Sequence, residues 1–93
     1  MAQRITTVIA HRQFKKHYQK RVAVHPALGK QFEKRYALFI ADRDERELSD
    51  HALVGELQGY RAFSITGDIR VVYQLINETT ALLLDIGKHN QVY

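Results

Sequence analysis

Residues 87–93, at the end of the sequence, carry three side chains that could act together on a phosphodiester. Lys88 could neutralise a phosphate, His89 could move a proton and Tyr93 could stack on a base. An apolar run over residues 81–86 precedes them and predicts a buried strand. The chain would then leave the sheet at a fixed point with these groups facing a ligand. The simpler alternative is a solvated terminus.

A second set of polar side chains lies upstream. His51 lies in a polar loop, Asp68 lies in a turn, and Arg70 is a lone charge near the start of a mostly apolar stretch. Together with His89 and Tyr93, they are the kinds of side chain that a metal-free ribonuclease needs. A base removes the proton of a ribose 2′-hydroxyl, a cation stabilises the phosphate, and an acid protonates the leaving 5′-oxygen.

Other kinds of site lack their sequence patterns. No His-x-x-x-His or cysteine pattern provides zinc ligands, no Gly-x-Ser-x-Gly marks a serine hydrolase, and no glycine pattern marks a nucleotide-binding loop. We therefore expect neither a metal nor a cofactor. The absence of cysteine excludes disulfides and fits a reducing compartment. Three further histidines, His11, His17 and His25, are expected to be surface residues.

The composition suits one compact domain over residues 1–93, with charge unevenly placed. Residues 1–35 hold nine Lys/Arg and one acidic residue, a net charge of +8. Residues 36–50 hold two Lys/Arg and five acidic residues, a net charge of −3. A basic first half suits nucleic acid or an acidic protein partner, although a solvated helix surface is the simpler explanation. No run approaches the ~20 apolar residues of a membrane span, and no signal peptide is evident, so a cytoplasmic protein is expected.

The hydrophobic pattern predicts one strand, two helices and three further strands. Residues 5–10 are rich in β-branched side chains and predict the first strand. Apolar positions at steps of four then predict two helices, the second with Pro26 in its first turn and its end near residues 42–47. The three further strands are expected over residues 60–65, 69–76 and 80–86.

Short turns between these last three strands require antiparallel pairing. The order β-α-α-β-β-β therefore predicts an α+β fold, with a helical hairpin packed on one face of a twisted, mainly antiparallel sheet. The other face stays open and could hold a binding site.

Three segments resemble the sequence patterns of one known family. Residues 51–61 resemble H-x-L-x-G-x-L-x-G-Y-R, residues 68–73 resemble D-x-R-[VL]-[VI]-Y, and residues 87–93 resemble G-x-H-x-x-[VL]-[YF]. In this order they resemble the RelE/ParE superfamily of toxins from bacterial type II toxin–antitoxin systems, and within it the YafQ-like mRNA interferases. The helical half agrees with that family in length and layout only.

The resemblance implies a RelE-like toxin that enters the ribosomal A site and cuts mRNA there by metal-independent acid–base chemistry. It also implies an antitoxin protein that blocks the toxin, in a complex that binds operator DNA. By motif, His51, Asp68 and His89 fall on acid/base positions. Arg70 falls on the phosphate-stabilising arginine, and Tyr93 on the aromatic residue that stacks on or positions the substrate.

The same motifs place Arg61 beside the pocket and make Arg61 and Lys88 candidate substrate-binding residues. One position departs from the family pattern. Ser64 stands four residues before Asp68, where YafQ-like toxins have a further histidine. A serine cannot act as a base at neutral pH, so His51 and His89 would carry the proton transfers.

Two other functions fit the same fold. A ParE-type toxin would poison DNA gyrase and would need no acid/base set, so His51 and His89 beside Arg70 argue against it. A non-catalytic module would keep only the antitoxin contact, and Ser64 gives this alternative some weight. A short acidic antitoxin gene beside this one would favour either toxin over the module.

Overall fold

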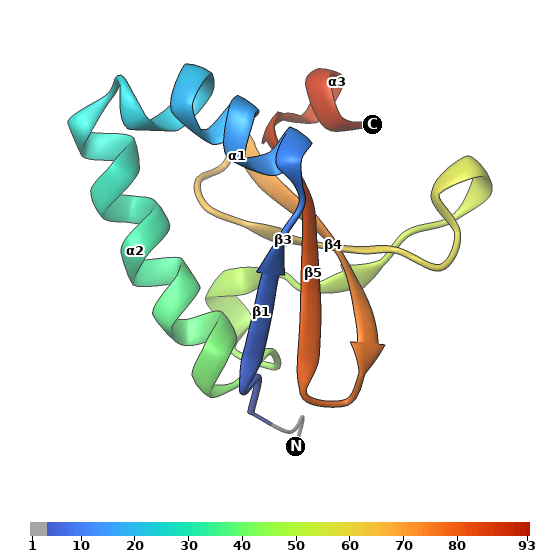
Figure 1. The fold of residues 1–93 in the computed structure, drawn as a ribbon. Coiled ribbons are helices and arrows are strands. Elements are labelled where there is room, and N and C mark those ends of the chain that lie inside the picture. Colours follow the sequence, from blue (N-terminus) through green and yellow to red (C-terminus); the bar gives the residue numbers. More distant parts are fainter. Residues whose placement is uncertain (1–3) are drawn as a thin grey trace.

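The computed structural model describes residues 4–93, which form a five-stranded sheet with helices along one side and at one end (Figure 1). The strands are β1 (Thr7–Ala10), β2 (His51–Ala52), β3 (Arg61–Ser64), β4 (Ile69–Asn77) and β5 (Thr80–Lys88). The helices are α1 (Arg12–Tyr18), the π-helical η1 (Gln19–Ala23), α2 (Pro26–Ala41), and α3 (His89–Val92), with 3-10 turns η2 (Arg46–Leu48) and η3 (Gly55–Leu57).

The sheet has the strand order β1-β5-β4-β3-β2. β1 pairs with β5 in parallel, and all other neighbours are antiparallel. The predicted α+β fold with a mainly antiparallel sheet is therefore confirmed. Two short elements differ from the prediction. The two-residue strand β2 forms where only a loop is expected, and the tail winds into the single turn α3.

Aromatic rings join the helical hairpin to the sheet. Phe39 of α2 stacks on Phe63 of β3, with ring centroids 4.4 Å apart, and meets Tyr73 of β4 edge-on at 4.8 Å. All three residues are fully buried. Burying one phenylalanine side chain contributes about 1.5–3 kcal/mol, so this cluster fixes α2 against β3 and β4.

A polar contact joins α1 to β5, and it corrects one expectation. The prediction that His17 is a surface residue is wrong. Its Nδ1 lies 2.6 Å from Oδ1 of Asp85, and only 21% of its side chain is exposed. The Asp85 carboxylate is buried and also accepts the backbone N–H of Ile86 at 2.8 Å. Because a buried carboxylate needs such partners, the contact fixes how α1 docks on β5.

Two other expectations about the surface hold. His11 and His25 are both exposed, and His11 accepts the backbone N–H of Gln13 through Nδ1, which caps α1. Among residues 4–93, no helix is both long enough and apolar enough to cross a bilayer.

Candidate functional site

The strand register decides which candidate side chains share a face of the sheet. Directly paired residues point to the same face, and successive residues of a strand point to opposite faces. Phe63 packs on Phe39 of α2 and therefore faces the helices. Its neighbour Ser64 pairs with Arg70 of β4, so both lie on the other face, which we call the open face.

His51 joins the open face through the unexpected strand β2. It pairs with Ala62, which lies two residues before Ser64 on β3. This places His51 and Ser64 as diagonal neighbours on the same face, with Cα atoms about 7–8 Å apart. The ring Nδ1 of His51 lies 2.8 Å from the carbonyl oxygen of Ser49. A carbonyl can only accept, so Nδ1 carries the proton and, in the neutral ring, Nε2 is free to act as a base.

Arg70 is half-buried and held by Ser64. Its Nη1 donates to Oγ of Ser64 at 2.6 Å. Within residues 4–93, no acidic side chain pairs with Arg70. Two carboxylates could have paired with Arg70, and neither does. Asp85 binds His17 and Arg21, and Asp68 is exposed in the turn before β4. The charge of Arg70 is therefore available to an anionic ligand.

The tail helix α3 brings two more candidate residues to this end of the sheet. The rings of His89 and Tyr93 meet edge-on with centroids 4.4 Å apart. Burial raises the pKa of Tyr93, and the positive charge of Arg70 lowers it by less, so the phenol stays protonated at neutral pH. α3 also contacts β4, the strand that carries Arg70. His89 itself is exposed.

Asp68 and Lys88 lie at the edges of this group. The backbone N–H of Asp68 donates to Oγ1 of Thr66 at 3.2 Å, which closes the turn, while the carboxylate makes no hydrogen bond within residues 4–93. Lys88 pairs with Ile69 at the end of the β4–β5 ladder, and its side chain is exposed. The structure therefore gathers Arg70, Tyr93 and His89 at this end of the sheet. Asp68 and Lys88 lie at the rim of that group.

Arg61 does not join the candidate site. It pairs with Tyr73, so it lies on the face that packs against α2. Its Nε donates to Oδ1 of Asp50 at 2.9 Å, and its Nη2 lies 2.7 Å from the same oxygen in an ion pair. The Tyr73 hydroxyl donates to Oδ2 of the same carboxylate. Burial alone would lower the pKa of Arg61, but the bonds to Asp50 and Tyr73 outweigh burial and raise it. Burial and the bond to Asp50 likewise raise the pKa of Tyr73 far above its usual range.

Replacing Arg61 by alanine is therefore expected to reduce stability by about 3 kcal/mol, because it leaves a buried carboxylate without its cation. The Asp50 side chain is only 3% exposed. Urea denaturation of Arg61→Ala beside wild type measures this loss. An Arg61→Ala protein as stable as wild type would instead show that the ion pair with Asp50 contributes little to the fold.

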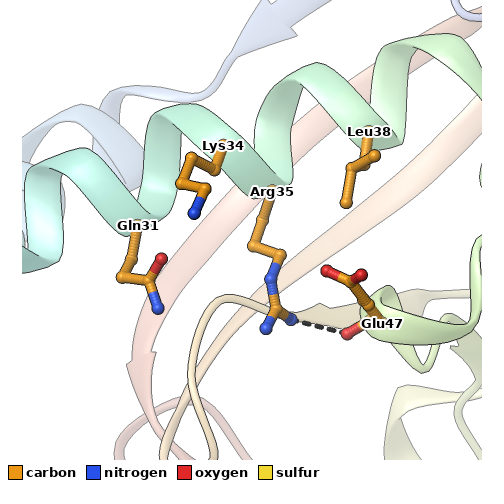
Figure 2. A pocket seen from close by; sticks show the side chains of 5 residues that line it. All are labelled: Gln31, Lys34, Arg35, Leu38 and Glu47. Atoms are coloured by element: carbon orange, nitrogen blue, oxygen red, sulfur yellow. Dashed lines mark hydrogen bonds between the residues drawn. The ribbon is translucent and has the colours of Figure 1, made fainter.

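Arg35 of α2 contacts the other end of β3, at Ser64. Figure 2 shows its guanidinium reaching from α2 to the carbonyl oxygen of Glu47, at 2.5 Å, across a hollow of about 470 Å³. The same Nη1 donates to the carbonyl oxygen of Ser64 at 3.3 Å. None of the candidate residues lines this hollow. Arg35 instead fixes the backbone of Ser64, and the Ser64 hydroxyl orients Arg70.

Comparison with known proteins identifies the family. The profile described as "Bacterial toxin of type II toxin-antitoxin system, YafQ" matches residues 6–93. The chain belongs to the YafQ family. The expected membership of the RelE/ParE superfamily and its YafQ-like branch is thereby confirmed. No curated protein sequence matches the chain.

Solved structures show the same fold as this YafQ-family chain. YafQ from E. coli BL21(DE3) is 19% identical and has a TM-score of 0.78, covering 98% of this chain and 99% of its own. The conserved hypothetical protein HP0894 from Helicobacter pylori is 20% identical with a TM-score of 0.70, covering 96% and 100%. A YoeB/ParE toxin from Agrobacterium tumefaciens is 13% identical with a TM-score of 0.75, covering 90% and 99%.

Proposed function

We propose that this YafQ-family toxin is a ribosome-dependent endoribonuclease that cuts mRNA through the ribose 2′-hydroxyl. The observation that supports it is the order of side chains across the sheet. Arg70 on β4, without an acidic partner, lies between His51 on β2 and His89, which follows β5. In-line displacement at a phosphate needs a base on one side and an acid on the other.

The proposed reaction uses these groups in turn. Nε2 of His51 takes the proton of the 2′-hydroxyl, and the 2′-oxygen attacks the adjacent phosphorus. The bond from phosphorus to the 5′-oxygen breaks, and His89 donates a proton to that oxygen. The products are a 2′,3′-cyclic phosphate and a free 5′-hydroxyl. Arg70 binds the non-bridging oxygens, where charge accumulates in the transition state.

Two further residues complete the proposal. Tyr93, protonated at neutral pH, stacks on or positions a base beside His89. Asp68, exposed on the turn two residues before Arg70, is a third acid/base group at the rim. Ser64 takes no part in proton transfer, because its hydroxyl binds Arg70 and is no base at neutral pH.

The exposure of the site explains why the ribosome is part of the proposal. His51, Asp68 and His89 are all exposed, so the protein by itself does little to hold an RNA strand in the in-line geometry. Purified protein is therefore expected to cut mRNA in ribosome complexes much faster than the same RNA in solution. Primer extension on both substrates measures the difference.

Equal cleavage of free and ribosome-bound RNA would contradict ribosome dependence. An intact message together with DNA damage on expression would instead favour a gyrase-poisoning toxin on the same fold. The two outcomes are separated by mapping cuts in cellular mRNA after brief induction.

An antitoxin is part of the same proposal. Two related structures are described as DinJ–YafQ complexes, one of them a toxin–antitoxin complex. The net charge of +8 over residues 1–35 suits an acidic segment of such a partner. We propose that a cognate antitoxin binds this chain, that the complex binds operator DNA, and that both act in the cytoplasm.

A further inference from the structure

A basic hollow of about 250 Å³ lies where η1, α2, β4, β5 and α3 meet. Its wall carries three permanent cations, from Lys20, Arg21 and Lys88, together with the imidazole of His25. The rest of the lining is apolar or neutral, and no acidic side chain is part of it. Like charges gathered in one concavity repel one another, so the hollow has the electrostatic character of an anion site.

Arg21 is held in place within this hollow. Its Nη1 donates to the carbonyl oxygen of Ile86 at 3.0 Å and lies 3.5 Å from Oδ1 of Asp85, the carboxylate that also binds His17. Its Nε and Nη2 make no hydrogen bond within residues 4–93, and 23% of the side chain is exposed. One edge of the guanidinium is thus fixed by the protein, while the other remains available to a ligand.

Gly87 makes this position of Arg21 possible. A Cβ atom on Gly87 would lie 2.7 Å from Nη1 of Arg21 and 2.7 Å from Oε1 of Gln91, which is closer than such atoms approach. The Gln91 amide oxygen in turn accepts the backbone N–H of Lys88 at 2.7 Å, which closes the turn into α3. The hollow is therefore built by tertiary contacts and is more than a chance gathering of surface lysines.

The hollow adjoins the candidate active site. Lys88 pairs with Ile69, which lines the hollow, and the next rung of the ladder pairs Gly87 with Arg70. Successive rungs are about 3.4 Å apart along the strands. Lys88 also directly precedes His89. Ile69 and Lys88 point to the helix-facing side and Arg70 to the open face, all at the end of the β4–β5 ladder. A strand that places one phosphate on Arg70 therefore reaches the hollow by passing around this end of the ladder.

We propose that the hollow binds a backbone phosphate of the same RNA strand, outside the bond that is cut. The proposal rests on the proposed function, because it takes the RNA path from the site at Arg70 and His89. Arg21 contacts the phosphate with its free edge, and the ammonium groups of Lys20 and Lys88 neutralise it. An acidic segment of a protein is the competing occupant.

The test uses 2′-O-methyl RNA oligonucleotides, which the protein can bind and cannot cut, from dinucleotide to hexanucleotide. Binding is measured by fluorescence anisotropy at several salt concentrations for wild type and for Lys20→Gln with Lys88→Gln. The matched control is Lys34→Gln with Arg46→Gln, which removes the same charge at two exposed residues of α2 and η2.

Wild-type affinity is expected to rise in a step once the RNA is long enough to reach the hollow. The Lys20/Lys88 variant should lose that step, with affinity for longer RNA about tenfold weaker and the log–log salt slope flatter by about 0.7 for one lost phosphate contact on a single strand. The Lys34/Arg46 control should keep both the step and the slope.

Equal losses in the two variants would show general attraction and would overturn the proposal. So would unchanged RNA binding in the Lys20/Lys88 variant together with weaker binding to an acidic antitoxin. Because these RNAs cannot be cut, the result is independent of catalysis. A protein that shows the step but cuts no message would refute the proposed function and leave the phosphate site standing.

Discussion

His89→Ala is expected to slow RNA cleavage by about 10²–10⁴-fold, the usual contribution of a general acid or base. The fold should be unaffected, because His89 is exposed and its ring contacts only Tyr93 among the aromatic residues of the described chain. Single-turnover cleavage of mRNA in ribosome complexes measures the loss, and thermal unfolding checks that the protein remains folded.

The matched control for His89 is Asn90→Ala. Asn90 is the next residue of α3 and is also exposed, so its replacement removes a polar side chain of the same turn without touching the proposed chemistry. Near wild-type cleavage is expected from this control. Full activity in a soluble His89→Ala protein would remove His89 from the mechanism and leave proton transfer to His51 and Asp68.

Two substitutions of Arg70 are expected to separate the effect of its charge from the effect of its planar geometry. Arg70→Ala should lose about 10²–10³-fold in cleavage rate, the usual effect of removing one group that stabilises transition-state charge. Arg70→Lys should fall between this variant and wild type, because lysine keeps the charge and loses the planar fork. Both rates are measured at saturating ribosome complex, so that weaker binding does not obscure the chemical step.

The stability of the Arg70 variants is the second half of that test. The side chain has one hydrogen bond, to Ser64, and lacks an acidic partner within residues 4–93. Its removal should therefore reduce stability by only about 0.5–1.5 kcal/mol. A much larger loss would make Arg70 a structural residue, and Lys88 would then be the next candidate for binding the scissile phosphate.

Ser64 connects this prediction to the departure from the family pattern. The family pattern of YafQ-like toxins has a histidine at that position. Here the hydroxyl of Ser64 orients Arg70 at 2.6 Å, and Arg35 holds the Ser64 carbonyl. The position thus has a structural function in this chain even without an imidazole.

The sequence by itself determined the type and order of the long elements. Apolar residues at steps of four fixed the two helices, and β-branched runs bounded by short turns fixed the longer strands, because periodic burial is a local property of the chain. Three spaced motifs also indicated the family. The short elements β2 and α3 gave no such signal, since two residues or one helical turn hold too little of either period.

Only the tertiary structure decided which polar side chains meet. Arg61 and Arg70 lie on neighbouring strands, and both are lone charges among apolar residues. The register pairs Arg61 with Tyr73 on the helix-facing side and Arg70 with Ser64 on the open face. A shift of one residue in that pairing would exchange the faces, and the pairing that sets the register forms only in the folded sheet. His17 meets Asp85 for a similar reason: the two are 68 residues apart, and the docking of α1 on β5 brings them within hydrogen-bond distance.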